Sequence, residues 1–467
     1  MSEATEQSQA PEAPATTKQA PVAAPQGSSS QAFTSLRSHT RTPSITLLPE
    51  AYQDPEAYLL DNRFHKSLKF RPSFVEPSAP AHRLTYAVAG STDPEAATLL
   101  WLNGLGGNRM AACFLDGICD EHDVRIISID RPASGGSTPV PLARRFEWTH
   151  EAVVALLAHE GITTFSILSH SNGELYTLYF LLNLQPRLTV LEWVASSPFV
   201  PPWLSGSIPL SIARWIPSQA TGSLGGLLSG IMKAESWSTG TASGLLAFSG
   251  GLSSGLANVS TGLAQGWAKG GGIEPEKEEE QAEEQALKRG DSQEKKFIQF
   301  ALRQAEKEPH KKAFGGRYYP PELFSIGLSW VLAEGLDAWG EEALVCLRKG
   351  DGARWGWGEG PEGEPVDEQL LFERGFGDLK IKLEEEARPT KMSVWFGEED
   401  GLIPPKGRAY LRDLLVERLK LVTEDDWHTI PDTGHDQTLS LDCMLVPLLR
   451  RVKASTSAHE EAKRARA

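Results

Sequence analysis

Short apolar runs that alternate with helical segments fill the middle of the chain and limit what it can fold into. Such short, nearly continuous runs are typical of strands buried on both faces of a parallel sheet, with helices as the connections. The pattern therefore predicts an α/β fold. The runs are Leu84–Ala89, Thr98–Leu102, Arg125–Ile129, Thr164–Leu168, Val190–Ala195 and Met392–Phe396, with a shorter one near Trp427–Ile430.

This rhythm stops near Ser196 and returns at Met392, which predicts one sheet interrupted by a long insertion. The first residues are rich in Ala, Pro, Ser, Thr and Gln, and such a composition buries too little apolar surface to fold. The predicted organisation is a disordered N-terminal tail at 1–45, a first core part at 46–195, an insertion at 196–388, a second core part at 389–453 and a loose charged C-terminal tail at 454–467.

The charge and the cysteine usage exclude several classes of protein. The 467 residues include 46 Lys+Arg and 61 Asp+Glu, a net charge of −15, which argues against nucleic acid as a partner. Only four cysteines occur, without a CxxC pair, so we expect a reducing compartment and neither a disulfide framework nor a cysteine-based metal site. With no run of 18 apolar residues, no membrane-spanning helix is predicted.

The N-terminal residues lack the basic and apolar segments of a secretory signal, so we expect a cytoplasmic protein. A mitochondrial presequence is the alternative. Arg37 and Arg41 favour it, whereas Glu3, Glu6 and Glu12 oppose it.

The most informative motif is Ser169-His170-Ser171-Asn172-Gly173, which directly follows one apolar run and opens a helical segment. A sharp turn in this context exposes a serine at the end of a strand, with the helix N-terminus facing the reaction. The small residue two positions before Ser171 and the glycine two positions after it let such a turn close.

Two further motifs follow later strands. Gly397–Pro404 comes directly after Met392–Phe396, and Asp432–Asp436 follows the last short strand. The order Ser, Asp, His, each after a strand, is the α/β-hydrolase order. The sequence therefore resembles the α/β-hydrolase family over about 80–200 and 390–453. The resemblance implies an α/β-hydrolase fold, with a mostly parallel eight-stranded sheet and a large, mainly helical cap inserted after the sixth strand.

Carried over by position, the resemblance implies Ser171 as the nucleophile, Asp400 as the acid and His435 as the base. The oxyanion would be held by the backbone N–H groups of Leu105 and Asn172. The expected substrate-binding residues are Asn103, Gly104 and His170. Two positions depart from the family pattern, because Asn103 replaces the usual histidine of the oxyanion loop and Ser169 replaces the usual first glycine of the turn.

Each site residue has a competitor. Glu398 and Glu399 precede Asp400 and are alternative acids. His428 competes with His435, but it falls within the short strand and is interpreted as structural. Asp130, in the segment that follows another strand, is interpreted as a hydrogen-bond hub rather than a catalytic residue.

The insertion contains an unusual stretch, because 14 of the 43 glycines fall in Gly222–Gly272. Ser236–Ala268 carries no charge, and its bulky residues recur every three or four positions, as on one face of a helix. Three interpretations are open: a lid over an apolar pocket, a lipid-binding helix that makes peripheral membrane contact through residues 222–268, and a low-complexity segment without structure. The acidic run Glu274–Glu284 that follows is interpreted as a solvated linker.

These features predict a serine hydrolase that cleaves a carboxylic ester, with lipid-like, thioester or amide substrates as further options. We expect a small apolar substrate as the partner, no nucleic acid, no organic cofactor and no metal. The alternative is a noncatalytic protein of the same fold that uses its cap to bind a membrane or another protein.

Overall fold

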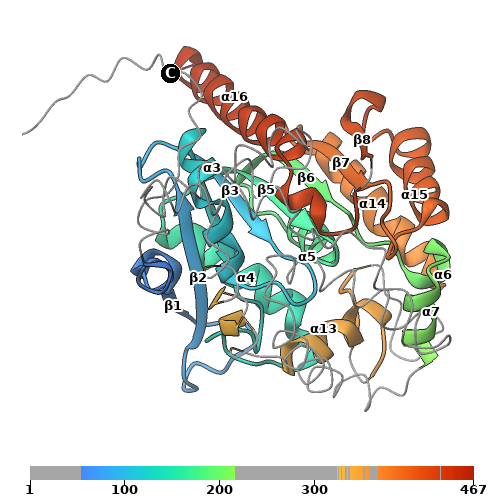
Figure 1. Cartoon of the computed structure of the whole chain (residues 1–467), viewed down its shortest axis with the longest axis horizontal. Helices are drawn as coiled ribbons and strands as arrows, with labels where there is room; N and C mark the ends of the chain where they lie inside the picture. Colours follow the sequence, from blue (N-terminus) through green and yellow to red (C-terminus); the bar gives the residue numbers. More distant parts are fainter. Residues whose placement is uncertain are drawn as a thin grey trace, which may run out of the picture. The chain divides into compact units, whose positions relative to one another are not determined.

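In the part of the chain that the structure describes, eight strands form one mixed sheet in the order β1-β2-β4-β3-β5-β6-β7-β8 (Figure 1). Strand β2 is antiparallel to both of its neighbours, whereas every pairing from β4 to β8 is parallel. This arrangement confirms the predicted mostly parallel eight-stranded sheet. The strands are β1 (Lys66–Phe70), β2 (His82–Gly90), β3 (Ala97–Leu102), β4 (Val124–Ile129), β5 (Thr164–His170), β6 (Thr189–Ser196), β7 (Lys391–Gly397) and β8 (Trp427–Ile430).

The computed structural model describes residues 54–215, 323, 326–327, 329–331, 334, 337–350, 353–357, 367–431 and 433–466, all within the unit Ile45–Ala467. The predicted N-terminal tail, the glycine-rich stretch at 222–272 and the acidic run Glu274–Glu284 lie outside these residues. The predictions for them therefore stay predictions.

Two apolar layers cover the two faces of the sheet. In β3, Leu100 and Leu102 pack in one layer, whereas Leu99 and Trp101 pack in the other, as expected from the alternation of side chains along a strand. The first layer contains α4 (Arg145–His159), α5 (Gly173–Leu182), α14 (Glu368–Glu385) and α15 (Pro405–Arg412). The second contains the 3-10 helix Arg109–Leu115, α3 (Asp116–Glu121) and α16 (Asp442–Arg466).

The described parts of the insertion between β6 and β7 include the helices α6 (Pro202–Ser205), α7 (Ile208–Trp215) and α13 (Asp337–Leu347). Helix α14 also precedes β7, but its buried residues Phe372 and Phe376 pack in the same layer as α5. Although the predicted insertion extends to residue 388, α14 thus belongs to a helical layer of the sheet.

The C-terminal residues differ from the prediction of a loose tail. Helix α16 continues to Arg466, because Ala, Glu, Lys and Arg are strong helix formers. Its middle is held to the sheet by Glu192 of β6, which accepts hydrogen bonds from Arg451 Nε at 2.7 Å and Ser455 Oγ at 2.6 Å. Among the helices that the structure describes, none is long and apolar enough to cross a membrane.

Candidate active site

Ser171 occupies a strained turn between β5 and α5. Its φ is 48°, in the left-handed region that costs a residue with a Cβ about 1–2 kcal/mol. The turn closes because position 173 is glycine, where an added Cβ would lie 2.1 Å from the Leu102 carbonyl oxygen. The Ser171 N–H donates to the Ser196 carbonyl at 3.1 Å, which ties the turn to the end of β6. Such a turn projects the serine from the carboxyl edge of the sheet.

Ser169 fits at the first position of this turn, where the family pattern has glycine. Its side chain is fully buried, and its hydroxyl accepts a hydrogen bond from Trp193 Nε1 of β6 at 2.8 Å. The extra hydroxyl therefore has a partner.

Asp400 and His435 meet after β7 and β8. Asp400 Oδ2 lies 2.8 Å from His435 Nδ1, and both side chains are buried. The other carboxylate oxygen, Oδ1, accepts hydrogen bonds from the N–H groups of Leu402 at 3.0 Å and Ile403 at 2.8 Å. The competing acids Glu398 and Glu399 are exposed. Of the three acids, Asp400 is therefore the one that orients the histidine.

The two groups shift each other's pKa in opposite directions. Burial alone would raise the pKa of Asp400, but His435 and the hydrogen bonds outweigh it, so this pKa is lowered. Burial alone would lower the pKa of His435, but the negative charges of Asp400 and Asp436 outweigh it, so this pKa is raised. The pair thus stabilises an imidazolium at His435.

The remaining nitrogen of this ring is unengaged. His435 Nε2 is buried and has no hydrogen-bond partner among the residues that the structure describes. The His435 backbone carbonyl accepts a hydrogen bond from Ser197 Oγ at 2.6 Å, so the end of β6 holds both this loop and the turn of Ser171. With Nδ1 facing a carboxylate, Nε2 is the nitrogen that can accept a proton.

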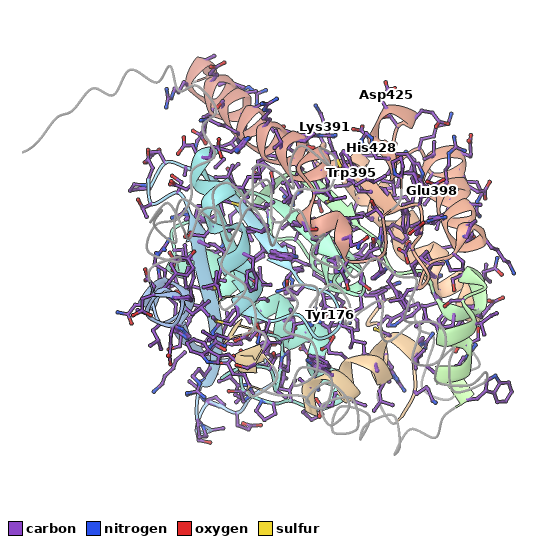
Figure 2. All side chains as sticks on the ribbon, in the orientation of Figure 1. Tyr176, Lys391, Trp395, Glu398, Asp425 and His428 are labelled. Atoms are coloured by element: carbon purple, nitrogen blue, oxygen red, sulfur yellow. The ribbon has the colours of Figure 1, made fainter. Side chains whose placement is uncertain are left out.

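His428 does not take part in this site. It lies in β8, where its ring stacks on Trp395 with the centroids 3.8 Å apart (Figure 2).

Asp130 is a hydrogen-bond hub, as predicted. It accepts from the Arg109 N–H and Nη1, each at 2.7 Å, and from Thr85 Oγ1 at 2.6 Å.

Three strands thus present the three residues at the same edge of the sheet. Ser171 follows β5, Asp400 follows β7 and His435 follows β8, and the parallel pairing of β5 to β8 places these strand ends together. With the order β1-β2-β4-β3-β5-β6-β7-β8 and β2 antiparallel, this decides the fold. The chain has the α/β-hydrolase fold.

Several solved structures of enzymes are similar to the chain at low sequence identity. A thermophilic esterase from Thermogutta terrifontis is 13% identical, with a TM-score of 0.37 over 86% of this chain and 98% of that one. A probable hydrolytic enzyme from Pseudomonas aeruginosa is 14% identical, with a TM-score of 0.41 over 83% and 93%. A proline iminopeptidase from Mycobacterium smegmatis is 14% identical, with a TM-score of 0.38 over 86% and 100%. The sequence matches no family profile and no curated protein.

The predicted oxyanion loop lies against the turn of Ser171. An added Cβ at Gly104 would lie 3.1 Å from Ser171 Cβ and 2.8 Å from His170 Cδ2. Arg131 donates from Nη1 to the Asn103 carbonyl and from Nη2 to the Gly104 carbonyl at 2.8 Å. In the part of the chain that the structure describes, neither the Leu105 nor the Asn172 backbone N–H has an acceptor. Both N–H groups are therefore unused donors in the described part of the chain.

The Asn103 side chain, in contrast, faces the protein interior. It is buried, and its amide donates to the Asn108 carbonyl at 3.2 Å and to Ser128 Oγ at 2.7 Å. The side-chain amide is thus occupied by interior partners, and the prediction that Asn103 binds substrate stays a prediction. The asparagine holds the loop in shape.

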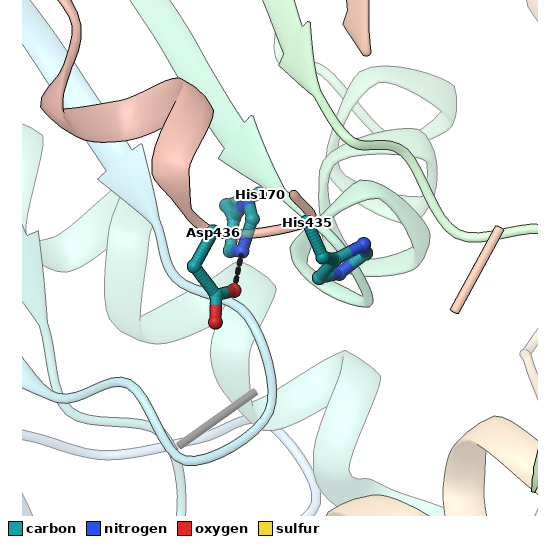
Figure 3. A group of neighbouring side chains, drawn as sticks. All are labelled: His170, His435 and Asp436. Carbon is teal, nitrogen blue, oxygen red and sulfur yellow. Dashed lines mark hydrogen bonds and ion pairs between the residues drawn. The ribbon is translucent and has the colours of Figure 1, made fainter. Parts of the chain in front are cut away.

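His170 lies beside His435 and has its own acid. Its Nδ1 is 3.1 Å from the Ser196 carbonyl oxygen, and its Nε2 is 2.7 Å from Asp436 Oδ1 (Figure 3). The ring centroids of His170 and His435 are 5.1 Å apart. His170 is a predicted substrate contact, whereas its partner Asp436, which directly follows His435, carries no signal in the sequence that would mark it.

A buried charge cluster behind the oxyanion loop was not predicted either. Glu342 of α13 lies 3.1 Å from Arg131 Nε and 3.0 Å from Arg145 Nε, and it accepts from Asn172 Nδ2 at 3.0 Å. Burial alone would raise the pKa of Glu342, but Arg131 and Arg145 outweigh it and lower this pKa. Because Asn172 directly follows Ser171, the cluster joins the insertion to the turn that holds the serine.

We expect Glu342→Gln to lower the free energy of unfolding by about 3–5 kcal/mol, because it leaves two buried guanidinium groups without their central carboxylate. The neighbouring Glu341 also pairs with Arg145, but its side chain is 38% exposed. Glu341→Gln should therefore cost less than about 1 kcal/mol. Urea unfolding of the two variants measures the difference, and equal losses would contradict the role given to Glu342.

Proposed function

We propose that the protein is a serine hydrolase that cleaves carboxylic esters through an acyl-enzyme on Ser171. The observation that carries this proposal is the buried Asp400–His435 pair, which leaves His435 Nε2 without a hydrogen-bond partner among the described residues. The His435 ring lies 5.1 Å from the ring of His170, the residue that precedes Ser171. The Asp400–His435 pair also favours an enzyme over a noncatalytic protein of this fold. A buried histidine with a purely structural role would be more stable with hydrogen bonds at both ring nitrogens, and His435 has one at Nδ1 alone among the described residues.

The mechanism follows from the residue types. His435 takes the Ser171 proton at Nε2 as the hydroxyl oxygen attacks the ester carbonyl, and it then returns the proton to the leaving alcohol. Asp400 holds the ring so that Nδ1 carries the other proton, and it stabilises the imidazolium. The N–H groups of Leu105 and Asn172 stabilise the oxyanion, each contributing about 3 kcal/mol. Water then attacks the acyl-enzyme by the same route.

The substrate class is a further part of the proposal. We propose a small apolar ester, with lipid-like and thioester substrates as alternatives, because the insertion after β6 carries many apolar residues. A cytoplasmic location and a peripheral membrane contact through residues 222–268 stay predictions from the sequence.

A fluorophosphonate probe tests the proposal, because it reacts only with an activated serine. The full-length protein should be labelled, and peptide mass spectrometry should place the label on Ser171. Heat-denatured protein is the control and should stay unlabelled. A folded protein that resists labelling, or that carries the label elsewhere, would contradict the proposal. Activity towards p-nitrophenyl esters of increasing chain length then identifies the preferred acyl group.

A further inference from the structure

The side chains of His170, His435 and Asp436 form a cluster with the composition of a metal site. One ligand atom from each residue lies within 4.8 Å of the others, and both histidines are buried (Figure 3). Among the residues that the structure describes, this is the group of histidine, cysteine and acidic side chains whose ligand atoms lie close enough together to hold a metal ion. The proposed mechanism uses only one of the three, so the pairing of His170 with Asp436 calls for another explanation.

Both histidines are oriented as zinc-binding histidines are. In such sites the ring donates from one nitrogen to a carboxylate or a backbone carbonyl and binds the ion with the other. His435 Nδ1 faces Asp400 at 2.8 Å, and His170 Nδ1 faces the Ser196 carbonyl at 3.1 Å. The Nε2 atom of each ring is thus the one that an ion could bind.

The two Nε2 atoms differ in what they now contact. His435 Nε2 is buried without a partner among the described residues. His170 Nε2 contacts Asp436 Oδ1 at 2.7 Å, a hydrogen bond that a bound cation would replace. An unpartnered buried nitrogen beside a carboxylate is an arrangement that a cation would satisfy.

From this geometry we propose that His170 Nε2, His435 Nε2 and the Asp436 carboxylate bind a zinc ion that inhibits the enzyme reversibly. Zinc accepts two imidazoles and a carboxylate, with ligand distances of about 2.0–2.2 Å, so its ligand atoms lie at most about 4 Å apart. The three ligand atoms now lie within 4.8 Å of one another and would have to come closer, whereas His170 Nε2 and Asp436 Oδ1, at 2.7 Å, would have to move slightly apart. Asp436 can supply this movement, because its side chain is 21% exposed.

Inhibition follows from the atom that zinc would occupy. The lone pair of His435 Nε2 cannot bind zinc and accept the Ser171 proton at the same time. The ion would therefore remove the general base without disturbing the Asp400–His435 pair. This consequence rests on the proposed function, whereas the binding of zinc does not.

The first measurement is binding, which needs no activity. Full-length protein freed of metal with EDTA is titrated with ZnCl2 by calorimetry. We expect one zinc ion per chain, and Asp436→Asn and His170→Gln should each raise the dissociation constant at least about 10-fold. His428→Gln and Cys443→Ser are the controls, because His428 lies in β8 and Cys443 is exposed on α16. Both should bind zinc as the unchanged protein does, and circular dichroism checks that every variant is folded.

The second measurement is the rate of fluorophosphonate labelling at Ser171. For each variant, the rate with added ZnCl2 is compared with the rate of the same variant without zinc. Zinc should slow labelling of the unchanged protein, EDTA should restore it, and MgCl2 should have no effect, because magnesium prefers oxygen ligands. Equal zinc binding by Asp436→Asn and the unchanged protein would overturn the site. Labelling that zinc leaves unchanged or accelerates would overturn the inhibition. Zinc binding that depends on the cluster, without labelling under any condition, would keep the site and refute the proposed function.

Discussion

Ser171→Ala should lower kcat for a p-nitrophenyl ester by about 10⁶-fold. The nucleophile, the base and the acid act together, so the loss of the serine abolishes the contribution of all three. Ser171→Gly should cause the same loss. The two variants should differ in stability, however. Ser171 has a φ of 48°, which glycine adopts without steric cost and alanine does not. We expect the glycine variant to be more stable than the alanine variant by about 1 kcal/mol.

Urea unfolding measures this difference, and the pair of variants separates catalysis from folding. Both lack the hydroxyl, so the difference in stability between them reports the backbone strain at residue 171, offset by the larger conformational entropy that glycine has in the unfolded chain. Retention of more than about one thousandth of the activity by either variant would refute Ser171 as the nucleophile. A glycine variant less stable than the alanine variant would show that the turn stores no strain at this residue.

The strands in the centre of the sheet could be predicted from the sequence because they are buried on both faces. Every residue of β3 is buried, which gives the continuous apolar run from which the strand was predicted. Strand β1 lies at the edge, and its burial alternates along Lys66–Phe70, so its five residues give too short a pattern to identify. The charge of the C-terminal residues suggested a loose tail, although the same residues favour a helix.

The site could be predicted only where a motif directly follows a strand. Ser171, Asp400 and His435 each occupy such a position, so their order along the chain was informative. The contact of Asn172 with Glu342 joins residues 170 positions apart, and that of His170 with Asp436 joins residues 266 positions apart. A single sequence does not indicate which buried acid meets which buried base, because the pairing depends on how the insertion and the last loop pack.

Asp400→Asn should lower kcat by about 10⁴-fold while the fold stays intact. Asp400 Oδ1 accepts hydrogen bonds from the N–H groups of Leu402 and Ile403, so the oxygen of an asparagine would stay there and its NH2 group would face His435 Nδ1. The ring would then accept a hydrogen bond at Nδ1 and carry its proton on Nε2. In that tautomer His435 cannot take the proton of Ser171.

The pH profile provides a second measurement on the same variant. Activity requires an unprotonated Nε2, and Asp400 contributes to the raised pKa of His435. In Asp400→Asn the pKa of His435 falls, so the acidic limb of kcat/KM should move to lower pH even though the plateau is lower. Glu399→Gln is the matched control, because Glu399 precedes Asp400 and is exposed. It should leave both the rate and the limb unchanged. If Asp400→Asn keeps its activity to within about 10-fold, or if its limb moves to higher pH, Asp400 is not the acid that orients His435.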